Sequence, residues 1–211
     1  MNMKDMTVTQ LSELTASSSA APGGGSISAM AGAYAASLAC MVAKLTLGKK
    51  GYEDVQERMA EIDKQAEILR LELLDEIQKD SESFDAYMVA LTLPKATEAE
   101  QAVRSAAMQE ALKGACRVPL EVAGKCLGVL HLAATALEHG NKNTASDGMV
   151  GVLLARAAVL GAVNNVLINL GGIKDKTFVT RMKQPARRWP GKPTKRRPPP
   201  TSACTPAERS R

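Results

Sequence analysis

Apolar residues recur at helical spacing through the middle of the chain. Between Glu53 and Leu91 successive apolar positions lie three or four residues apart, at Val55, Met59, Ile62, Ala66, Leu69, Leu73 and Ile77. This spacing places them on one face of a helix of several turns. Strand alternation occurs nowhere, and the aromatic residues that sheets favour make up only 3% of the chain. The sequence therefore predicts an all-α fold and disfavours all-β and Rossmann-type folds.

Two further predicted helices carry almost no charge. The segment from Ile27 to Leu47 has Lys44 as its single charge, and the segment from Asp147 to Leu170 has Arg156 as its only base. The first is just long enough to span a bilayer, but its Ala, Gly and Ser residues add little transfer free energy. We therefore expect a soluble helix buried on all sides and no membrane partner. Because one domain can hardly hide two such helices, we expect an antiparallel bundle that forms a homodimer.

Several residues mark expected helix ends. Thr97 with Glu100 three residues later predicts a capping box at a helix start. Pro119 is expected to kink or restart that helix, and Gly140-Asn141 to end it with a left-handed residue. Ser146 is the expected N-cap of the next helix. The glycines before Ile27 are expected to form a loop that stops any helix.

The C-terminal segment differs in composition from the rest. Residues 181–211 hold ten Lys and Arg, one acid and seven of the ten prolines, so they carry +9 while residues 1–180 carry −4. We expect a helical domain over residues 1–180, a boundary near Thr180 and a disordered basic tail over residues 181–211. The abrupt change resembles a shifted reading frame or an altered C-terminus. Such a tail would bind nucleic acid only nonspecifically.

Cysteine and histidine placement predicts neither disulfides nor a metal centre. Four cysteines are scattered without CxxC spacing, and no signal-peptide pattern precedes them, so we expect the reducing cytoplasm. Cys40 is expected to be a small core residue. His131 and His139 lie two turns apart, beyond shared ligation, so we expect no metal.

Three polar clusters stand against this apolar background. Pro22 to Ser26 is a glycine-rich loop whose N–H groups could hold a carboxylate, a phosphate or an oxyanion, or it is a flexible entry loop. Asp80, Phe84 and Tyr87 share one helical face and are either part of an acid–base site or a solvated face over a core Phe. Gly140 to Asp147 is a polar loop before an apolar helix, for which simple capping is the alternative.

These clusters, in this order, resemble the cyclodeaminase/cyclohydrolase family, which includes the C-terminal domain of formiminotransferase-cyclodeaminase and free-standing methenyltetrahydrofolate cyclohydrolases. The resemblance runs from about Leu11 to Phe178. It rests on Ala21-Pro22-Gly23-Gly24-Gly25-Ser26, Met41-Val42, Leu45-Thr46, Gly48-Lys49-Lys50, Asp80 through Phe84 to Ala86-Tyr87, Leu93-Pro94-Lys95, Val118-Pro119-Leu120, Gly140-Asn141 with Ser146-Asp147, and Asn165 to Leu170. After Met182 this chain departs from the charged C-terminal helix expected in the family.

The resemblance implies an all-helical dimer that acts on a tetrahydrofolate carrying a one-carbon unit, with no permanently bound cofactor and no metal. Either water opens 5,10-methenyltetrahydrofolate to 10-formyltetrahydrofolate, or N10 attacks a 5-formimino group and ammonia leaves. The cyclohydrolase is favoured because this chain holds no formiminotransferase. A non-catalytic helical interaction protein is the alternative, and the intact polar clusters argue against it.

The resemblance also suggests roles for individual residues. We predict carboxylates that move protons or bind the pterin, hydrogen-bonding groups that line the pocket, and cations that meet the folate carboxylates. The carboxylates are Asp80 and Asp147, with Asp85 third; the pocket residues are Gly23, Gly24, Gly25, Ser26, Tyr87 and Asn141; the cations are Lys95 and, more weakly, Lys44.

Overall fold

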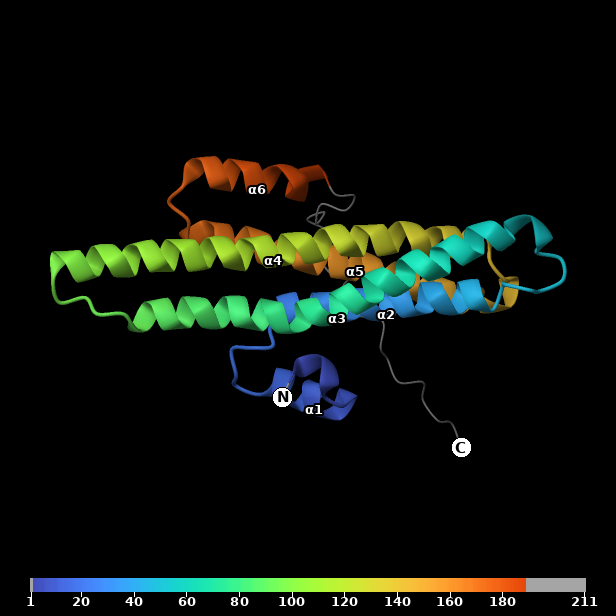
Figure 1. The fold of residues 1–211 in the computed structure, drawn as a ribbon, viewed down its shortest axis with the longest axis horizontal. Helices are drawn as coiled ribbons and strands as arrows, with labels where there is room; N and C mark the ends of the chain where they lie inside the picture. Colours follow the sequence, from blue (N-terminus) through green and yellow to red (C-terminus); the bar gives the residue numbers. More distant parts are fainter. Residues whose placement is uncertain (1, 189–211) are drawn as a thin grey trace, which may run out of the picture.

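Four long helices form an antiparallel bundle in the computed structural model, which describes residues 2–188 and the side chains of residues up to Gln184. They are α2 (Gly24–Lys44), α3 (Gln56–Thr92), α4 (Glu98–His139) and α5 (Ala145–Asn169). Each helix packs on the next along the chain, and α5 packs back on α2 to close the ring (Figure 1). Residues 2–188 contain no strand. The predicted all-α bundle is confirmed.

Two short helices flank the bundle. Helix α1 (Val8–Ala16) follows a 3₁₀ turn, η1 (Met3–Asp5), and lies beside α2 and α3; α6 (Lys176–Arg188) lies over α4 (Figure 1). Three more 3₁₀ turns sit at helix ends: η2 (Glu53–Val55), η3 (Lys142–Thr144) and η4 (Leu170–Gly172). Helices α3 and α4 extend past the start of α2 and the end of α5, so one end of the bundle is a protruding hairpin (Figure 1).

Small side chains let the helices approach closely. A Cβ at Gly32 of α2 would lie 2.5 Å from Cys126 Sγ of α4, so no larger residue fits there without a shift. Cys40, Cys116 and Cys126 are buried, and burial raises the pKa of their thiols to about 11, 11 and 12. Cys40 is therefore a core residue, as predicted.

Pro119 does not restart α4, so that part of the expectation is wrong. The helix is continuous from Glu98 to His139, with Pro119 inside it. A proline lacks the N–H that would bond to the carbonyl four residues earlier, here that of Ala115. Asn169 Nδ2 donates to Ala115 O at 2.7 Å instead. The freed carbonyl therefore keeps a partner, which explains why the helix continues.

Other predicted helix ends differ in detail. The Thr97–Glu100 capping box is confirmed. Helix α2 already begins at Gly24, so the glycine run forms its first turn. Gly140 has φ −79°, which is not left-handed, and α5 starts at Ala145, which leaves Ser146 inside the helix.

Helix α6 corrects the expected boundary near Thr180. It continues to Arg188 and includes Pro185, so residues 181–188 are helical and a C-terminal helix is present. Phe178 and Met182 are buried against α4 and α5, and Asp175 Oδ1 accepts from Phe178 N at 2.9 Å at its start. This burial stabilises the helix despite the one donor lost at the proline. The predicted tail beyond residue 188 lies outside the described residues.

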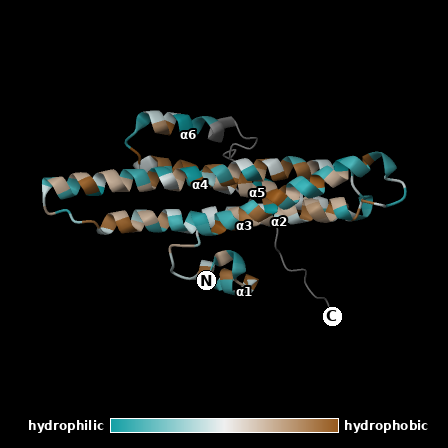
Figure 2. Cartoon of the chain, in the orientation of Figure 1, coloured by the Kyte–Doolittle hydropathy of each residue, from teal (hydrophilic) through white to brown (hydrophobic). Residues whose placement is uncertain are grey.

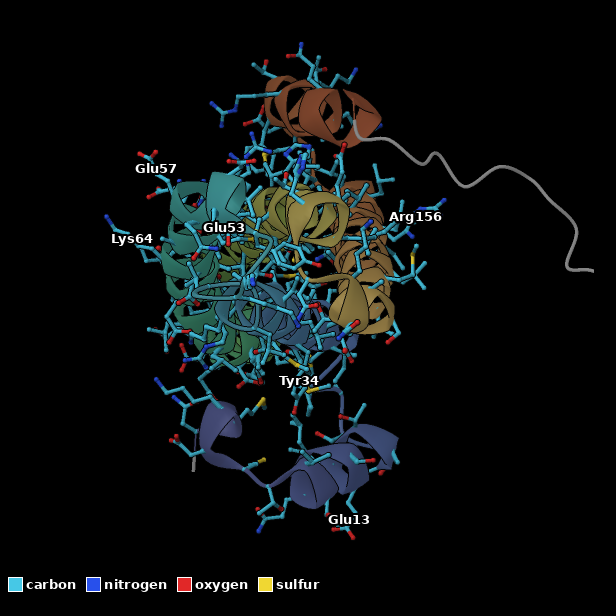
Figure 3. All side chains as sticks on the ribbon, turned by 90° about the vertical axis from the view of Figure 1, so that its right-hand side faces the viewer. Glu13, Tyr34, Glu53, Glu57, Lys64 and Arg156 are labelled. Atoms are coloured by element: carbon cyan, nitrogen blue, oxygen red, sulfur yellow. The ribbon has the colours of Figure 1, made fainter. Side chains whose placement is uncertain are left out.

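Apolar side chains remain exposed on α2 and α5. Helix α2 is not buried on all sides, because Tyr34 and Met41 are exposed, and Leu153 and Ile168 are exposed on α5. Figure 2 shows apolar residues along both helices, and in Figure 3 the side chain of Tyr34 projects from the bundle on the side of α1. Three helical segments, within α2, α4 and residues 142–172, are long and apolar enough to cross a membrane. The absence of a membrane partner stays a prediction.

Candidate functional site

A polar cleft opens where α2 begins and α5 ends, at the base of the protruding α3–α4 hairpin. Its volume is about 310 Å³. All four bundle helices and the loop before α2 contribute to its lining: Ala20, Ala21, Gly23, Gly24, Gly25, Asp80, Ser81, Ser83, Phe84, Tyr87, Leu112, Ala115, Asn165 and Asn169. The predicted face of Asp80, Phe84 and Tyr87 does point into one site. Within this lining Asp80 is the only carboxylate, and no Lys or Arg is present.

Asp80 is held against the first turn of α2. Ser26 Oγ donates to Asp80 Oδ2 at 2.9 Å. The N-cap residue of α2, Gly23, makes no side-chain capping bond, so Asp80 brings an anion from α3 to the positive end of α2. Gly25 permits this approach, because a Cβ there would lie 2.6 Å from Asp80 Cγ and closer still to Oδ1. Gly25 therefore allows the Asp80 carboxylate to lie against the first turn of α2.

Opposing forces set the protonation of Asp80. Burial raises the pKa of this carboxyl, the hydrogen bonds from the Ser26 hydroxyl and backbone lower it, and the nearby charge of Glu76 raises it. The net result is a pKa above the ordinary value. A carboxyl of this kind can accept and return a proton closer to neutral pH than an exposed one.

Asn165 and Asn169 line the cleft and were not among the predicted site residues. Asn165 Nδ2 donates to Gly161 O at 2.9 Å, and Asn169 Nδ2 donates to Ala115 O at 2.7 Å. With each amide nitrogen engaged, the side-chain carbonyls are the groups left to accept from a ligand. Two Asn residues four apart on an almost uncharged helix were the sequence signal for this pair.

Three predicted residues lie at the opposite end of the bundle. Asp147 is in the first turn of α5, about 27 Å along that helix from Asn165. Asn141 joins two loops there, since its N–H donates to Thr46 Oγ1 at 2.8 Å and its Nδ2 to Leu45 O at 3.0 Å. Lys44 Nζ lies 3.4 Å from Asp63 Oδ1, with which it forms an ion pair. Within one chain these residues do not meet Asp80.

Two further predicted residues lie outside the lining of the cleft. Asp85 is exposed on α3, and Lys95 is exposed in the loop between α3 and α4. The structure therefore brings together Asp80, Tyr87, Gly23, Gly24 and Gly25, with Ser26 bonded to Asp80, and leaves the other predicted residues apart. The roles predicted for those residues remain untested.

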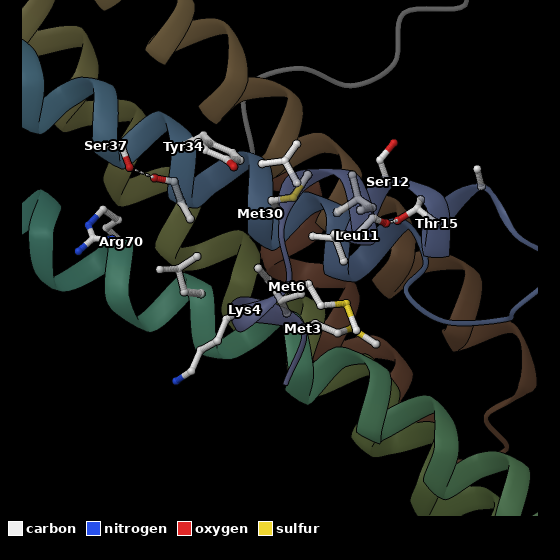
Figure 4. Close-up of a pocket in the computed structure, with 16 residues that line it drawn as sticks. Met3, Lys4, Met6, Leu11, Ser12, Thr15, Met30, Tyr34, Ser37 and Arg70 are labelled. Atoms are coloured by element: carbon white, nitrogen blue, oxygen red, sulfur yellow. Dashed lines mark hydrogen bonds between the residues drawn. The ribbon is translucent and has the colours of Figure 1, made fainter. Parts of the chain in front are cut away.

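A larger cavity of about 600 Å³ lies between the N-terminal segment and the α2–α3 face (Figure 4). Its lining is mainly apolar, with Met3 and Met6 on one side and Met30 of α2 on the other, and it includes no carboxylate. Arg70 at its edge is already paired with Glu67. The smaller polar cleft is therefore the better candidate for proton chemistry.

Within residues 2–188 no group of three or more His, Cys, Asp or Glu residues could hold a metal ion. The expectation of a metal-free site stays a prediction. The cleft offers one carboxyl, a phenol, hydroxyls and amides, which together can bind a polar heterocycle and move a proton.

Sequence comparison identifies relatives along most of the chain. Residues 7–188 match the family described as Formiminotransferase-cyclodeaminase. The methenyltetrahydrofolate cyclohydrolase of Methylorubrum extorquens is 44% identical over 163 residues, which cover 77% of this chain and 78% of that protein. The formimidoyltransferase-cyclodeaminase of Gallus gallus is 39% identical over 79% of this chain, and this chain spans only 31% of that relative's length.

Structural comparison agrees. The crystal structure of formiminotetrahydrofolate cyclodeaminase from Thermotoga maritima has a TM-score of 0.77 to this chain at 36% identity, over 87% of this chain and 88% of that one. The match through residue 188 takes in α6 and the whole cleft. With this fold and this extent of similarity, the chain belongs to the formiminotransferase-cyclodeaminase family.

Proposed function

We propose that this protein hydrolyses 5,10-methenyltetrahydrofolate to 10-formyltetrahydrofolate in the polar cleft. The main support is the composition of the cleft lining: within the described residues it contains the half-buried carboxyl of Asp80 and no cationic side chain. The bridging carbon of the substrate belongs to a cationic amidinium, which a carboxylate stabilises and a lysine would repel. The 44% identity to a methenyltetrahydrofolate cyclohydrolase supports the same reaction.

Asp80 serves as the proton carrier in this reaction. A water molecule adds to the bridging carbon and gives up a proton to the Asp80 carboxylate, which leaves a neutral tetrahedral carbinolamine. The bond from this carbon to N5 then breaks, N5 takes the proton from Asp80, and the hydroxyl proton leaves as the formyl carbonyl forms. Substrate cation and water thus become 10-formyltetrahydrofolate and one released proton, and Asp80 returns to its starting state.

The remaining groups orient the substrate. The side-chain carbonyls of Asn165 and Asn169 face pterin N–H groups, Tyr87 hydrogen-bonds to the ligand, and Phe84 offers an apolar surface for its ring. No permanently bound cofactor takes part. Holding the bridging carbon beside Asp80 lowers the entropic part of the barrier.

The second candidate is formimidoyltetrahydrofolate cyclodeaminase activity in the same cleft. The likeness to the Thermotoga maritima cyclodeaminase structure supports it. N10 would attack the carbon of the protonated formimino group and lose its proton to Asp80, which returns that proton to the amino group as ammonia leaves and the methenyl cation forms. Because both reactions pass through a tetrahedral carbon between nitrogens, one carboxyl can serve either.

A direct assay separates these candidates. The purified chain is mixed with 5,10-methenyltetrahydrofolate, and the loss of its near-ultraviolet absorbance is followed beside a buffer blank. Ammonia release from 5-formiminotetrahydrofolate is measured in parallel. We expect fast loss of the methenyl absorbance; ammonia release alone would favour the cyclodeaminase, and neither activity would favour a non-catalytic interaction protein.

We also propose a cytoplasmic homodimer formed through the outward faces of α2 and α5. Leu153 is 55% exposed and Ile168 76% exposed, and both lie on the outer side of an almost uncharged helix. Burying such residues against a second copy removes apolar surface from water. Light scattering should give a dimer for the wild type and a monomer for Leu153→Glu. Wild-type protein that stays soluble only with detergent would instead indicate a lipid partner.

A further inference from the structure

Glu76 is a buried carboxylate on α3, one helical turn before Asp80. Its side chain is 0% exposed, and Oε1 accepts from Lys79 Nζ and from Lys125 Nζ of α4, each at 2.8 Å. Among the described residues its other oxygen, Oε2, has no hydrogen-bond partner. Burying a carboxylate is costly, and an apolar residue of similar volume often gives equal or better stability. The packing of the bundle does not by itself explain this residue.

Glu76 forms the inner part of a charge network beside the cleft. The side chain of Lys79 is 54% exposed, and that of Lys125 is 23% exposed and also approaches Glu72 at 3.4 Å. Residues four apart on a helix are neighbours on its surface, so the Glu76 charge lies close to Asp80. Its repulsion is among the causes that raise the pKa of Asp80, after burial, which is the largest.

The other groups around Asp80 are uncharged. Helix α2 presents Ser26, α4 presents Leu112 and Ala115, and α5 presents Asn165 and Asn169. In the described lining, Tyr87 is the only other titratable side chain. The charge that acts on Asp80 therefore comes from Glu76, whose own charge Lys79 and Lys125 partly balance.

We propose that Glu76 is a positioning residue for Asp80. Its buried negative charge, partly balanced by Lys79 and Lys125, adds to the effect of burial, so that Asp80 is basic enough to take a proton from the attacking water and to hold it for N5. This role rests on the proposed folate reaction. A stronger base removes the water proton more readily, so the buried charge acts on the chemical step rather than on substrate binding.

Two variants change this charge in opposite directions. Glu76→Gln removes the repulsion, so the acid limb of the kcat profile should move to lower pH by about half a unit or more, and kcat should fall about threefold to tenfold with KM within about twofold. Lys79→Met removes a balancing cation, so the acid limb should move to higher pH. If the two substitutions only loosened the core, kcat would fall in both variants, but the acid limb would not move to lower pH in one and to higher pH in the other. Glu82→Gln, an exposed carboxyl on the same helix, is the matched control and should leave the profile unchanged.

A readout without turnover separates this inference from the proposed function. The carboxyl carbon of Asp80 is followed by ¹³C NMR against pH, with its signal assigned by its loss in Asp80→Asn. The pH midpoint of the Asp80 titration should fall in Glu76→Gln and rise in Lys79→Met. An unchanged midpoint in Glu76→Gln would overturn the inference even if the enzyme is active. If Glu76→Gln does not fold, as judged by circular dichroism, an unchanged midpoint in the surface variant Lys79→Met would overturn it.

Discussion

Gly25→Ala tests whether the close contact between Asp80 and the first turn of α2 is needed for activity. The new Cβ would lie 2.6 Å from Asp80 Cγ and closer still to Oδ1, whereas ordinary contacts begin at 3.4 Å, so the carboxyl must move by at least about 0.8 Å. A misplacement of about 1 Å at a reacting group costs on the order of 10²-fold in rate. We therefore expect kcat on 5,10-methenyltetrahydrofolate to fall about 100-fold.

Stability should change little in the same variant. Gly25 lies in the first turn of α2 without a positive φ, so alanine improves helix propensity by up to about 1 kcal/mol. Weakening the Ser26–Asp80 hydrogen bond costs a similar ~0.5–1.5 kcal/mol, and the two effects roughly cancel. Urea unfolding followed by circular dichroism measures the balance.

Gly114→Ala is the matched control for this variant. Gly114 lies within α4, and a Cβ there would meet no atom within 4 Å. We expect full activity and a stability gain of up to about 1 kcal/mol. Wild-type turnover in Gly25→Ala, with the fold intact, would refute the claim that this glycine positions the Asp80 carboxylate for chemistry.

Three further predictions concern charge and burial. Burial raises the pKa of Asp80 above its unfolded value of 3.8, so the stability that this carboxyl contributes at low pH is lost as pH rises through the native pKa. In urea titrations Asp80→Asn should therefore gain stability relative to wild type between about pH 4 and about pH 7. A difference in unfolding free energy that stays constant over this range would contradict the prediction. Asp147→Asn should keep kcat within about twofold and change stability by about 1 kcal/mol or less, since Asp147 acts on the α5 dipole far from the cleft; a 100-fold loss would place Asp147 in a site completed by a second copy. The fourth cysteine, Cys204, lies outside the described residues and is replaced in Cys204→Ser so that only the three buried thiols remain. These thiols, with pKa values of about 11, 11 and 12, should resist a disulfide reagent at about pH 8 until the protein is unfolded, and fast labelling would show that the core opens.

Periodicity and capping residues were enough to predict the fold class and most helices. The spacing of Leu73 and Ile77 defined α3, and Thr97 with Glu100 marked the start of α4, because these signals act within one helix. The restart expected at Pro119 does not occur because Asn169, a residue of another helix, bonds to the freed carbonyl. Helix α6 was missed because the burial of Phe178, a tertiary contact, outweighs the proline-rich composition.

The candidate site was predicted in part for the same reason. Asp80 and Tyr87 were found because residues four and seven apart on one helix share a face. Asp147 was grouped with Asp80 because the local sequence pattern does not reveal that Asp147 lies at the other end of the bundle, at the start of α5. Glu76 was overlooked among surface acids, although it lies three residues after Leu73, on the buried face of α3. Helix packing, not local pattern, decides which of these side chains meet.

The most direct test of the central claim compares the turnover of 5,10-methenyltetrahydrofolate by wild type, Asp80→Asn and Glu82→Gln under identical conditions. Asparagine keeps the shape of Asp80 and can still accept from Ser26, so it removes only the ability to carry a proton. We predict rapid hydrolysis by wild type and Glu82→Gln, and a loss of ~10²–10⁴-fold in kcat for Asp80→Asn with its circular dichroism unchanged. Wild-type turnover by Asp80→Asn would show that Asp80 is not the proton carrier.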